Sequence, residues 1–134
     1  MIFAKKSLGQ NFLIDKNIIK KIINFININD KNIIEIGPGK GALTEEIIKN
    51  NPKSLILIEK DNVLFENLKL KYSNNHILKI YNDDILNFNI EKIIKEDTVI
   101  FGNLPYNISS QILIKFLKFK VWPPRFSDLI LMFQ

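Results

Sequence analysis

Short apolar runs alternate along the chain with segments whose apolar residues recur every three or four positions. The runs are typical of buried strands, and they predict strands at 32–36, 54–58, 77–81, 98–101 and 129–133. Helical spacing predicts helices at 16–27, 42–50, 62–72 and 107–119, with a further short helix over 85–95. Asp15 is the expected N-cap of the first helix. The last helix should place one apolar face against the core, formed by Ile108, Ile112, Phe116 and Phe119.

Strands that alternate with helices of this length predict βαβ units and a parallel sheet, that is, the α/β class. The chain has 134 residues, which suits one domain rather than two. In such sheets, ligands bind outside the carboxyl ends of the strands. Polar motifs follow four of the predicted strands, so we expect the functional site at that edge of the sheet.

The first motif is a glycine-rich loop between the first strand and the next helix, Glu35-Ile-Gly37-Pro-Gly39-Lys-Gly41. Glycines allow a sharp turn and a close approach of the backbone to a ligand. This spacing predicts a nucleoside cofactor. Glu59 ends the second strand about 20 residues later, where a carboxylate can accept hydrogen bonds from ribose hydroxyls. NAD and S-adenosylmethionine both carry such a ribose, so these two motifs leave the choice between them open.

Two more motifs follow the third and fourth strands. After the third, Asp84 is the candidate acceptor for an adenine amino group, and Asp83 is interpreted as a turn residue. After the fourth comes Asn103-Leu104-Pro105-Tyr106. The Asn103 side-chain oxygen and the Leu104 carbonyl can both accept hydrogen bonds from an amino group on a planar base. Pro105 stiffens the turn, and Tyr106 can stack on the base. This motif favours S-adenosylmethionine and an amino-methylation reaction.

Composition narrows the class of protein further. The net charge of +5 fits a polyanionic partner. The absence of Cys excludes disulfides and thiolate metal sites, and a single His76 excludes a multi-histidine site within this chain, so no metal is predicted. No apolar run approaches the roughly 20 residues that span a bilayer, and charges interrupt any signal-peptide core near the N-terminus. A cytoplasmic protein without membrane contact is therefore expected.

Three motifs taken together resemble one family. The N-terminal arm, Ser-Leu-Gly-Gln-Asn-Phe-Leu-Ile-Asp, the glycine loop and the Asn-Leu-Pro-Tyr-Asn-Ile-Ser segment match the small-subunit ribosomal RNA adenine N6-dimethyltransferases, the KsgA type. The resemblance implies a Rossmann-like S-adenosylmethionine-dependent methyltransferase fold. Members dimethylate two adjacent adenines in an rRNA hairpin loop.

The resemblance also implies roles for individual residues. Asn11 and Leu13 of the arm help to seat the cofactor, and Gly37, in the loop with Gly39, contacts its amino-acid end. Glu59 binds the cofactor's ribose and Asp84 its adenine. Asn103 lies between the cofactor and the target base. The small-subunit rRNA, in the assembling small ribosomal subunit, is then the expected partner.

Family members continue beyond the equivalent of Gln134 with further strands and a helical C-terminal domain. The chain is therefore interpreted as a catalytic domain that ends after about five strands, with an arm at 1–15 and a cofactor-binding core at 16–134. We expect it to be a monomer and not to dimethylate rRNA unaided. Salt-sensitive RNA binding is expected from cations of the arm and of the C-terminal third, namely Lys5, Lys6, Lys115, Lys118, Lys120 and Arg125.

Two alternatives stay open. One is the related group that methylates large-subunit rRNA and confers antibiotic resistance. Gly9 and Leu104 favour the small-subunit group, because the other usually has Ser and Ile at these positions. The second is a non-catalytic RNA- or protein-binding relative, which the intact Asn103–Tyr106 segment disfavours.

Overall fold

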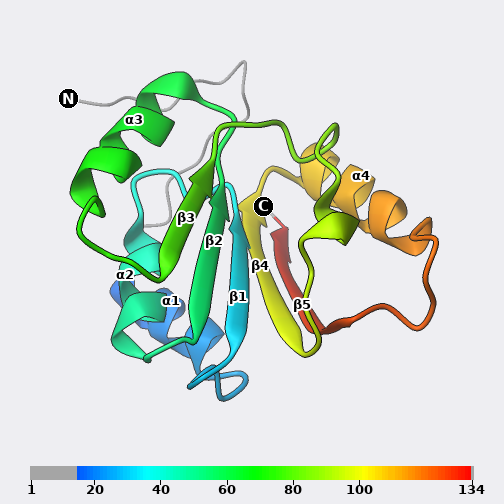
Figure 1. Ribbon diagram of the computed structural model, residues 1–134, viewed down its shortest axis with the longest axis horizontal. Helices are drawn as coiled ribbons and strands as arrows, with labels where there is room; N and C mark the ends of the chain where they lie inside the picture. Colours follow the sequence, from blue (N-terminus) through cyan, green and yellow to red (C-terminus); the bar gives the residue numbers. More distant parts are fainter. Residues whose placement is uncertain (1–14, 134) are drawn as a thin grey trace.

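A five-stranded parallel sheet between two helical layers forms the core of the computed structural model, which describes residues 15–133 (Figure 1). The strand order is β3-β2-β1-β4-β5, and every neighbouring pair is parallel. The strands are β1 (Asn32–Ile36), β2 (Ser54–Ile58), β3 (Leu78–Tyr81), β4 (Thr98–Leu104) and β5 (Phe126–Phe133). The helices are α1 (Lys16–Ile23), α2 (Ala42–Lys49), α3 (Asn62–Lys71), the 3-10 turn η2 (Ile90–Lys92) and α4 (Tyr106–Leu117).

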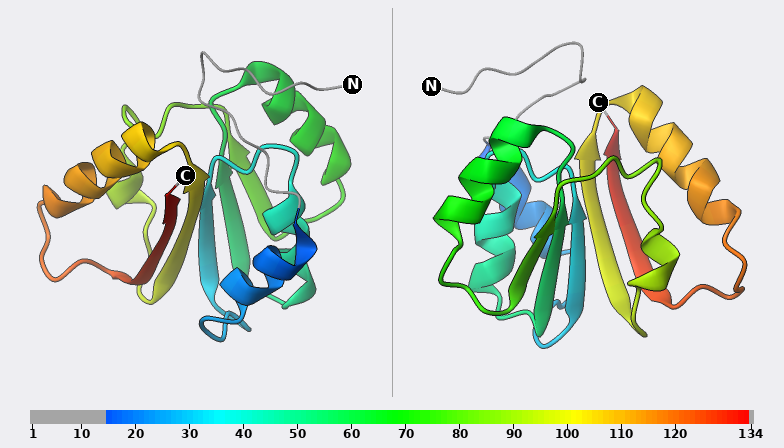
Figure 2. Two further views of the ribbon diagram at one scale, coloured as in Figure 1. Left: turned by 180° about the vertical axis from the view of Figure 1, so that it is seen from behind. Right: turned by 45° about the horizontal axis from the view of Figure 1, so that its top comes forward.

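Alternate residues of the central strand β1 face opposite layers. Ile33 belongs to the core shared with α1, α2 and α3, whereas Ile34 and Ile36 belong to the core shared with α4 and η2. Figure 2 shows the two layers on either side of the sheet. Because both faces are covered, the strands are almost continuously apolar, as parallel strands generally are.

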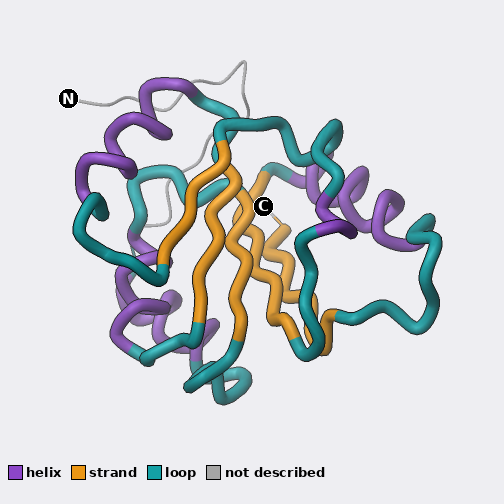
Figure 3. The backbone as a smooth tube through the Cα atoms, in the orientation of Figure 1, coloured by secondary structure: helices purple, strands orange, loops and turns teal. Residues whose placement is uncertain are grey.

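The strand register aligns the carboxyl ends of four strands. Ile36 pairs with Ile58 on one side and with Gly102 on the other, and Ile58 pairs with Tyr81. The segments that follow β1, β2 and β3, together with the end of β4, therefore lie in one row along a single edge of the sheet (Figure 3). This is the edge at which the sequence places the functional site.

The predicted strands and long helices are confirmed, with corrections at their limits, among them the last helix, which ends at Leu117 rather than at 119. The first helix ends at Ile23 rather than at 27, although Asp15 does cap it, accepting from the backbone N–H groups of Asn17 at 2.9 Å and Ile18 at 3.3 Å. The fourth strand continues to Leu104, and the fifth begins at Phe126. Both are longer than predicted because they pair along their length, from Thr98 with Phe126 to Leu104 with Phe133.

The helix predicted over 85–95 is wrong. Only Ile90–Lys92 is helical, and as a single 3-10 turn. Asp84 starts only a short turn, in which its carboxylate accepts from the backbone N–H of Leu86 and its carbonyl accepts from those of Asn87 and Phe88. The helical bonding stops there, since the next N–H groups donate to nearer carbonyls, that of Ile90 to Phe88 at 2.9 Å and that of Lys92 to Asn89 at 3.3 Å. The apolar residues Ile85, Ile90 and Ile94 are nevertheless buried beneath α4.

Within residues 15–133, none of the helices has the length and apolar character that crossing a bilayer requires. The same residues contain no cluster of three or more His, Cys, Asp or Glu side chains with the geometry of a metal site.

Candidate active site

The glycine loop requires glycine at the positions that the sequence singled out. Gly37, Gly39 and Gly41 have φ angles of 69°, 60° and 91°, in the left-handed region that side chains disfavour. A Cβ on Gly37 would lie 2.6 Å from Cδ2 of Leu104, so the glycine loop is packed directly against the end of β4. The Gly37 N–H donates to the carbonyl of Ile58 at 2.9 Å, which fixes the start of the loop beside β2.

Glu59 ties this loop to the helix that follows β2. One carboxylate oxygen accepts from the Gly39 N–H at 3.0 Å, and the other accepts from the Asp61 N–H at 2.9 Å. The side chain is buried, and burial is the main reason that its pKa is raised above the ordinary value. A carboxylate offers about four lone-pair positions, so these two bonds leave capacity for further hydrogen bonds.

Asp61 caps helix α3 next to this carboxylate. Its side chain accepts from the backbone N–H groups of Val63 and Leu64, both at 2.9 Å. The cap fixes where α3 begins, and therefore where the chain leaves Glu59.

Glu35 is a buried carboxyl group to which the sequence assigned no role. It is 2% exposed, and the Thr44 hydroxyl donates to it at 2.6 Å, which joins the end of β1 to the first turn of α2. Burial raises the pKa of Glu35 to about 8; the Thr44 hydrogen bond opposes this rise and the charge of Glu59 adds to it. The available signal was an acid within the run Asn-Ile-Ile-Glu-Ile, in a strand buried on both faces.

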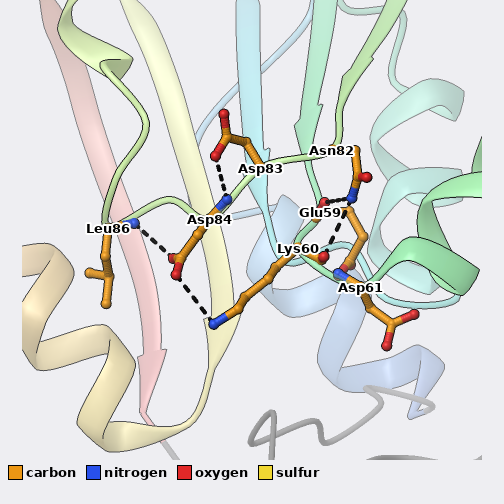
Figure 4. A network of polar contacts seen from close by, with 7 residues as sticks. All are labelled: Glu59, Lys60, Asp61, Asn82, Asp83, Asp84 and Leu86. Atoms are coloured by element: carbon orange, nitrogen blue, oxygen red, sulfur yellow. Dashed lines mark hydrogen bonds and ion pairs between the residues drawn. The ribbon is translucent and has the colours of Figure 1, made fainter.

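The segment after β3 lies beside Glu59. The Asn82 amide donates to the carbonyls of Glu59 at 3.0 Å and Lys60 at 3.3 Å, and the Asp83 N–H donates to the Glu59 carbonyl at 3.2 Å (Figure 4). The Asp83 carboxylate accepts from the N–H of Asp84 at 2.8 Å, as expected of a turn residue. Neither Asn82 nor Lys60 was predicted to contribute, because their meeting depends on the pairing of β2 with β3.

Asp84, the predicted adenine contact, has a partly exposed side chain. One carboxylate oxygen lies 3.2 Å from the Lys60 ammonium, and the other accepts from the Leu86 N–H at 3.0 Å (Figure 4). These contacts hold the carboxylate at the edge of the sheet, next to the end of β2. Lys60 and Leu86 therefore fix the orientation in which the Asp84 carboxylate would meet a ligand.

The segment Asn103–Tyr106 joins β4 to α4. Asn103 and Leu104 are the last two residues of β4 rather than part of a loop after it, which corrects the predicted strand end. Pro105 is the N-cap residue of α4, and the Ser109 hydroxyl donates to the Leu104 carbonyl at 3.3 Å. Tyr106 is 64% exposed, which leaves its ring accessible.

The predicted site residues thus converge along one edge. In strand order, this edge carries Asp84, Glu59, Gly37 and Asn103. The backbone carbonyl oxygen of Asn103 lies 3.8 Å from the position that a Cβ on Gly37 would take, so the glycine loop and the Asn103–Tyr106 segment, which we call the target segment after its predicted role, are packed together. Asn11 and Leu13 lie outside the described residues.

The strand order, the glycine loop after β1 and the acid after β2 together define the Rossmann-like fold of S-adenosylmethionine-dependent methyltransferases. Two solved structures support this class. The 23S rRNA methyltransferase ErmE matches with a TM-score of 0.77 at 26% identity, over 92% of this chain and 48% of ErmE. A dimethyladenosine transferase from Plasmodium falciparum matches with a TM-score of 0.75 at 29% identity, over 92% of this chain and 43% of that protein.

Within that class, the chain belongs to the ribosomal RNA adenine dimethylase family, whose model matches residues 2–134. It is similar to the ribosomal RNA small subunit methyltransferase A of Pelagibacter ubique, with 47% identity over 134 residues. That alignment covers 98% of this chain and 49% of the relative. The chain therefore spans about half the length of the curated relatives it matches.

Proposed function

We propose that this chain binds S-adenosylmethionine along the carboxyl edge of the sheet and directs methyl transfer to the N6 amino groups of two adjacent adenines in small-subunit rRNA. The observation that carries the proposal is the contact between Gly37 of the glycine loop and Leu104 of the target segment. It supports a cofactor site and an amino-group site that are neighbours, as a direct transfer between two ligands requires.

The residues present fit the cofactor chemically. The Glu59 carboxylate retains lone pairs for ribose hydroxyls after accepting from Gly39 and Asp61. Asp84, held by Lys60, offers a carboxylate to an adenine amino group. We assign Gly37 and Gly39 to the amino-acid end of the cofactor, and Asn11 and Leu13 to its remaining contacts. The sulfonium of S-adenosylmethionine supplies the methyl group.

The target amino group is held by acceptors rather than activated by a base. The Asn103 side-chain oxygen and the second lone pair of the Leu104 carbonyl accept the two amino hydrogens, which turns the nitrogen lone pair toward the cofactor. The Tyr106 ring stacks on the base, an interaction worth about 1–3 kcal/mol. No strong base is required before attack, because the methylated ammonium is acidic and loses its proton readily.

Cofactor binding is tested by titration calorimetry of the chain with S-adenosylmethionine and with NAD. We expect binding of S-adenosylmethionine alone, because the target segment beside Gly37 suits methyl transfer and leaves no role for a nicotinamide. Binding of NAD without S-adenosylmethionine would overturn the cofactor assignment.

The reaction is tested with labelled S-adenosylmethionine and unmethylated small ribosomal subunits, in a protein that contains this chain in full. Asn103→Ala should remove most methyl transfer while the cofactor affinity falls much less, and the exposed Asn74→Ala serves as the matched control. An unchanged rate in Asn103→Ala would refute the amino-group assignment. Preferential methylation of large-subunit rRNA would favour the antibiotic-resistance group instead.

A further inference from the structure

A groove runs along the second half of α4, on the face of the sheet opposite α1, α2 and α3. It consists of two adjoining hollows of about 600 Å³ and about 420 Å³ that share Asn89, Glu91, Phe119 and Lys120. Its walls come from the segment after β3, from α4 and from the connection between α4 and β5. We call it the α4 groove, lined from residues 86–94, 111–120 and 121–125.

The residues that line this groove are rich in positive charge. Its lining contains one carboxylate, Glu91, and five cations, Lys92, Lys115, Lys118, Lys120 and Arg125. Four net positive charges therefore gather here, compared with +5 for all 134 residues. A basic concentration of this kind fits a polyanion, because each cation that neutralises a phosphate releases a counterion.

The one carboxylate has a structural role. Its two oxygens accept from the backbone N–H groups of Lys120 at 3.2 Å and Val121 at 3.1 Å. Glu91 therefore anchors the connection between α4 and β5 against η2 without using the lysine ammonium groups. Those groups remain on the solvent side of the groove, since Lys118 and Lys120 are both exposed.

Lys115 also belongs to the wall. Its ammonium donates to the carbonyl of Ile85 at 2.7 Å and to that of Phe88, and burial is the main reason that its pKa is lowered. Arg125 forms an ion pair with Glu96, whose carboxylate oxygen lies 3.6 Å from the Arg125 Nε. The cations best placed for an external polyanion are Lys92, Lys118 and Lys120. Lys118 and Lys120 were expected from the sequence, whereas Lys92 was not.

Exposed apolar side chains lie close to Lys118 and Lys120 in the sequence; of these, Val121 lines the second hollow, and Trp122 follows it outside the lining. Trp122 is 53% exposed, and its neighbour Val121 and the helix residue Leu117 are also exposed. An exposed indole beside lysines is suited to stacking on an unpaired base while the lysines hold the backbone. This combination favours a nucleic-acid strand over an acidic protein surface, which would supply no planar bases.

The groove lies on the same helix as the target segment. Helix α4 begins at Tyr106, and its residues from Gln111 onward line the first hollow, whose other wall begins at Leu86, two residues after Asp84. At 1.5 Å per residue, the helix extends about 16 Å from Tyr106 to Leu117. Figures 1 and 2 show α4 and the connection that follows it beside the loop after β3.

Resting on the proposed function, we propose that the α4 groove binds the rRNA strand next to the target adenine, with Lys92, Lys118 and Lys120 at its phosphates and Trp122 stacked on an unpaired base. When the target adenine is held at Asn103, the nucleotides next to it would then lie along α4.

The test measures fluorescence anisotropy of a labelled RNA hairpin, with two adjacent adenines in its loop, against the chain over a range of KCl concentrations. The double variant Lys118→Gln with Lys120→Gln should lower the salt slope of log K by about 1.4, and the affinity about 25-fold near 0.1 M salt. Trp122→Ala should lower the affinity about fivefold or more and leave the slope unchanged. The matched control removes the same charge elsewhere, with Lys53→Gln and Lys79→Gln, and should change the slope little.

Three outcomes would overturn the inference. The first is an unchanged slope in the Lys118 and Lys120 variant, which would show that these lysines do not contact RNA phosphates. The second is an equal loss in the control pair, which would reduce the effect to net charge. The third is no measurable hairpin binding by the unaltered chain. Failure of the proposed function is separate, because S-adenosylmethionine binding and the effect of Asn103→Ala are measured without any change in the groove.

Discussion

Replacing Glu35 by Gln should alter the pH dependence of folding stability. In the folded chain the carboxyl group is buried and its pKa is about 8, compared with 4.5 for the unperturbed group. Between these values the unfolded chain carries an ionised Glu35 while the folded chain keeps it protonated. A proton is thus released on unfolding, so this group's contribution to stability is complete below pH 4.5 and is lost as the pH rises through 8.

The size of this contribution follows from the difference in pKa. A change from 4.5 to about 8 corresponds to about 5 kcal/mol in total, of which about 3–4 kcal/mol falls between pH 5 and pH 8. This is a large share of the 5–15 kcal/mol by which domains are typically stable. Gln cannot ionise, so Glu35→Gln removes the pH dependence. Its second amide hydrogen has no counterpart on a protonated Glu, which costs about 1–3 kcal/mol if it is left unsatisfied.

The assay is urea unfolding of both chains at pH 5 and pH 8. We expect Glu35→Gln to be less stable than the unaltered chain at pH 5 and equally or more stable at pH 8. Glu66→Gln, on the exposed side of α3, is the control and should leave the difference between the two pH values unchanged. If the unaltered chain and Glu35→Gln respond equally to pH, the buried carboxyl group is not the source of the effect, and the reasoning from burial is refuted.

Three further substitutions test the site and its supports. Glu59→Ala should weaken S-adenosylmethionine binding by about 1–3 kcal/mol in calorimetry, and unchanged affinity would contradict its assignment to the ribose. Gly37→Ala should destabilise the chain by about 1–2 kcal/mol from its positive φ alone, plus the cost of displacing Leu104. Combining it with Leu104→Ala should cost less than the sum of the two single changes in urea unfolding, whereas strict additivity would argue against the contact. Asp61→Ala should cost about 1–2 kcal/mol through the lost cap of α3, and a smaller loss would show that the cap is dispensable.

The sequence predicted the fold well because the signal for parallel strands is local. A run such as Ser54–Ile58 is apolar after its first residue, and its limits match the prediction without change. The segment 85–95 was mispredicted for an equally local reason. Its apolar residues have helical spacing, but the N–H groups of Ile90 and Lys92 donate to carbonyls only two and three residues back, which the spacing does not reveal.

The candidate site was predicted less completely than the fold. The glycines and Glu59 stand at spacings that a motif can capture, and Asn103–Tyr106 is a contiguous string. In contrast, the bonds from Asn82 to the carbonyls of Glu59 and Lys60, and the ion pair of Lys60 with Asp84, join segments more than 20 residues apart. No periodicity encodes them, because they depend on which strands become neighbours. The hydrogen bonds of Lys115 could not be predicted for the same reason. Its ammonium donates to the carbonyls of Ile85 and Phe88 only because α4 packs against the segment after β3.

The packing at this edge also links the two candidate binding functions mechanically. Gly37 is assigned to the proposed cofactor site by its backbone, but the side chain it accommodates is Leu104, the neighbour of Asn103. Glu59 is assigned to the same proposed site by its carboxylate, but that carboxylate also holds Gly39 and Asp61 in place. A substitution at either residue therefore also displaces neighbouring residues that support the rest of the proposed site. Loss of methyl transfer on its own cannot assign a residue here to the target base, whereas the comparison of cofactor affinity with transfer rate in the same variant can.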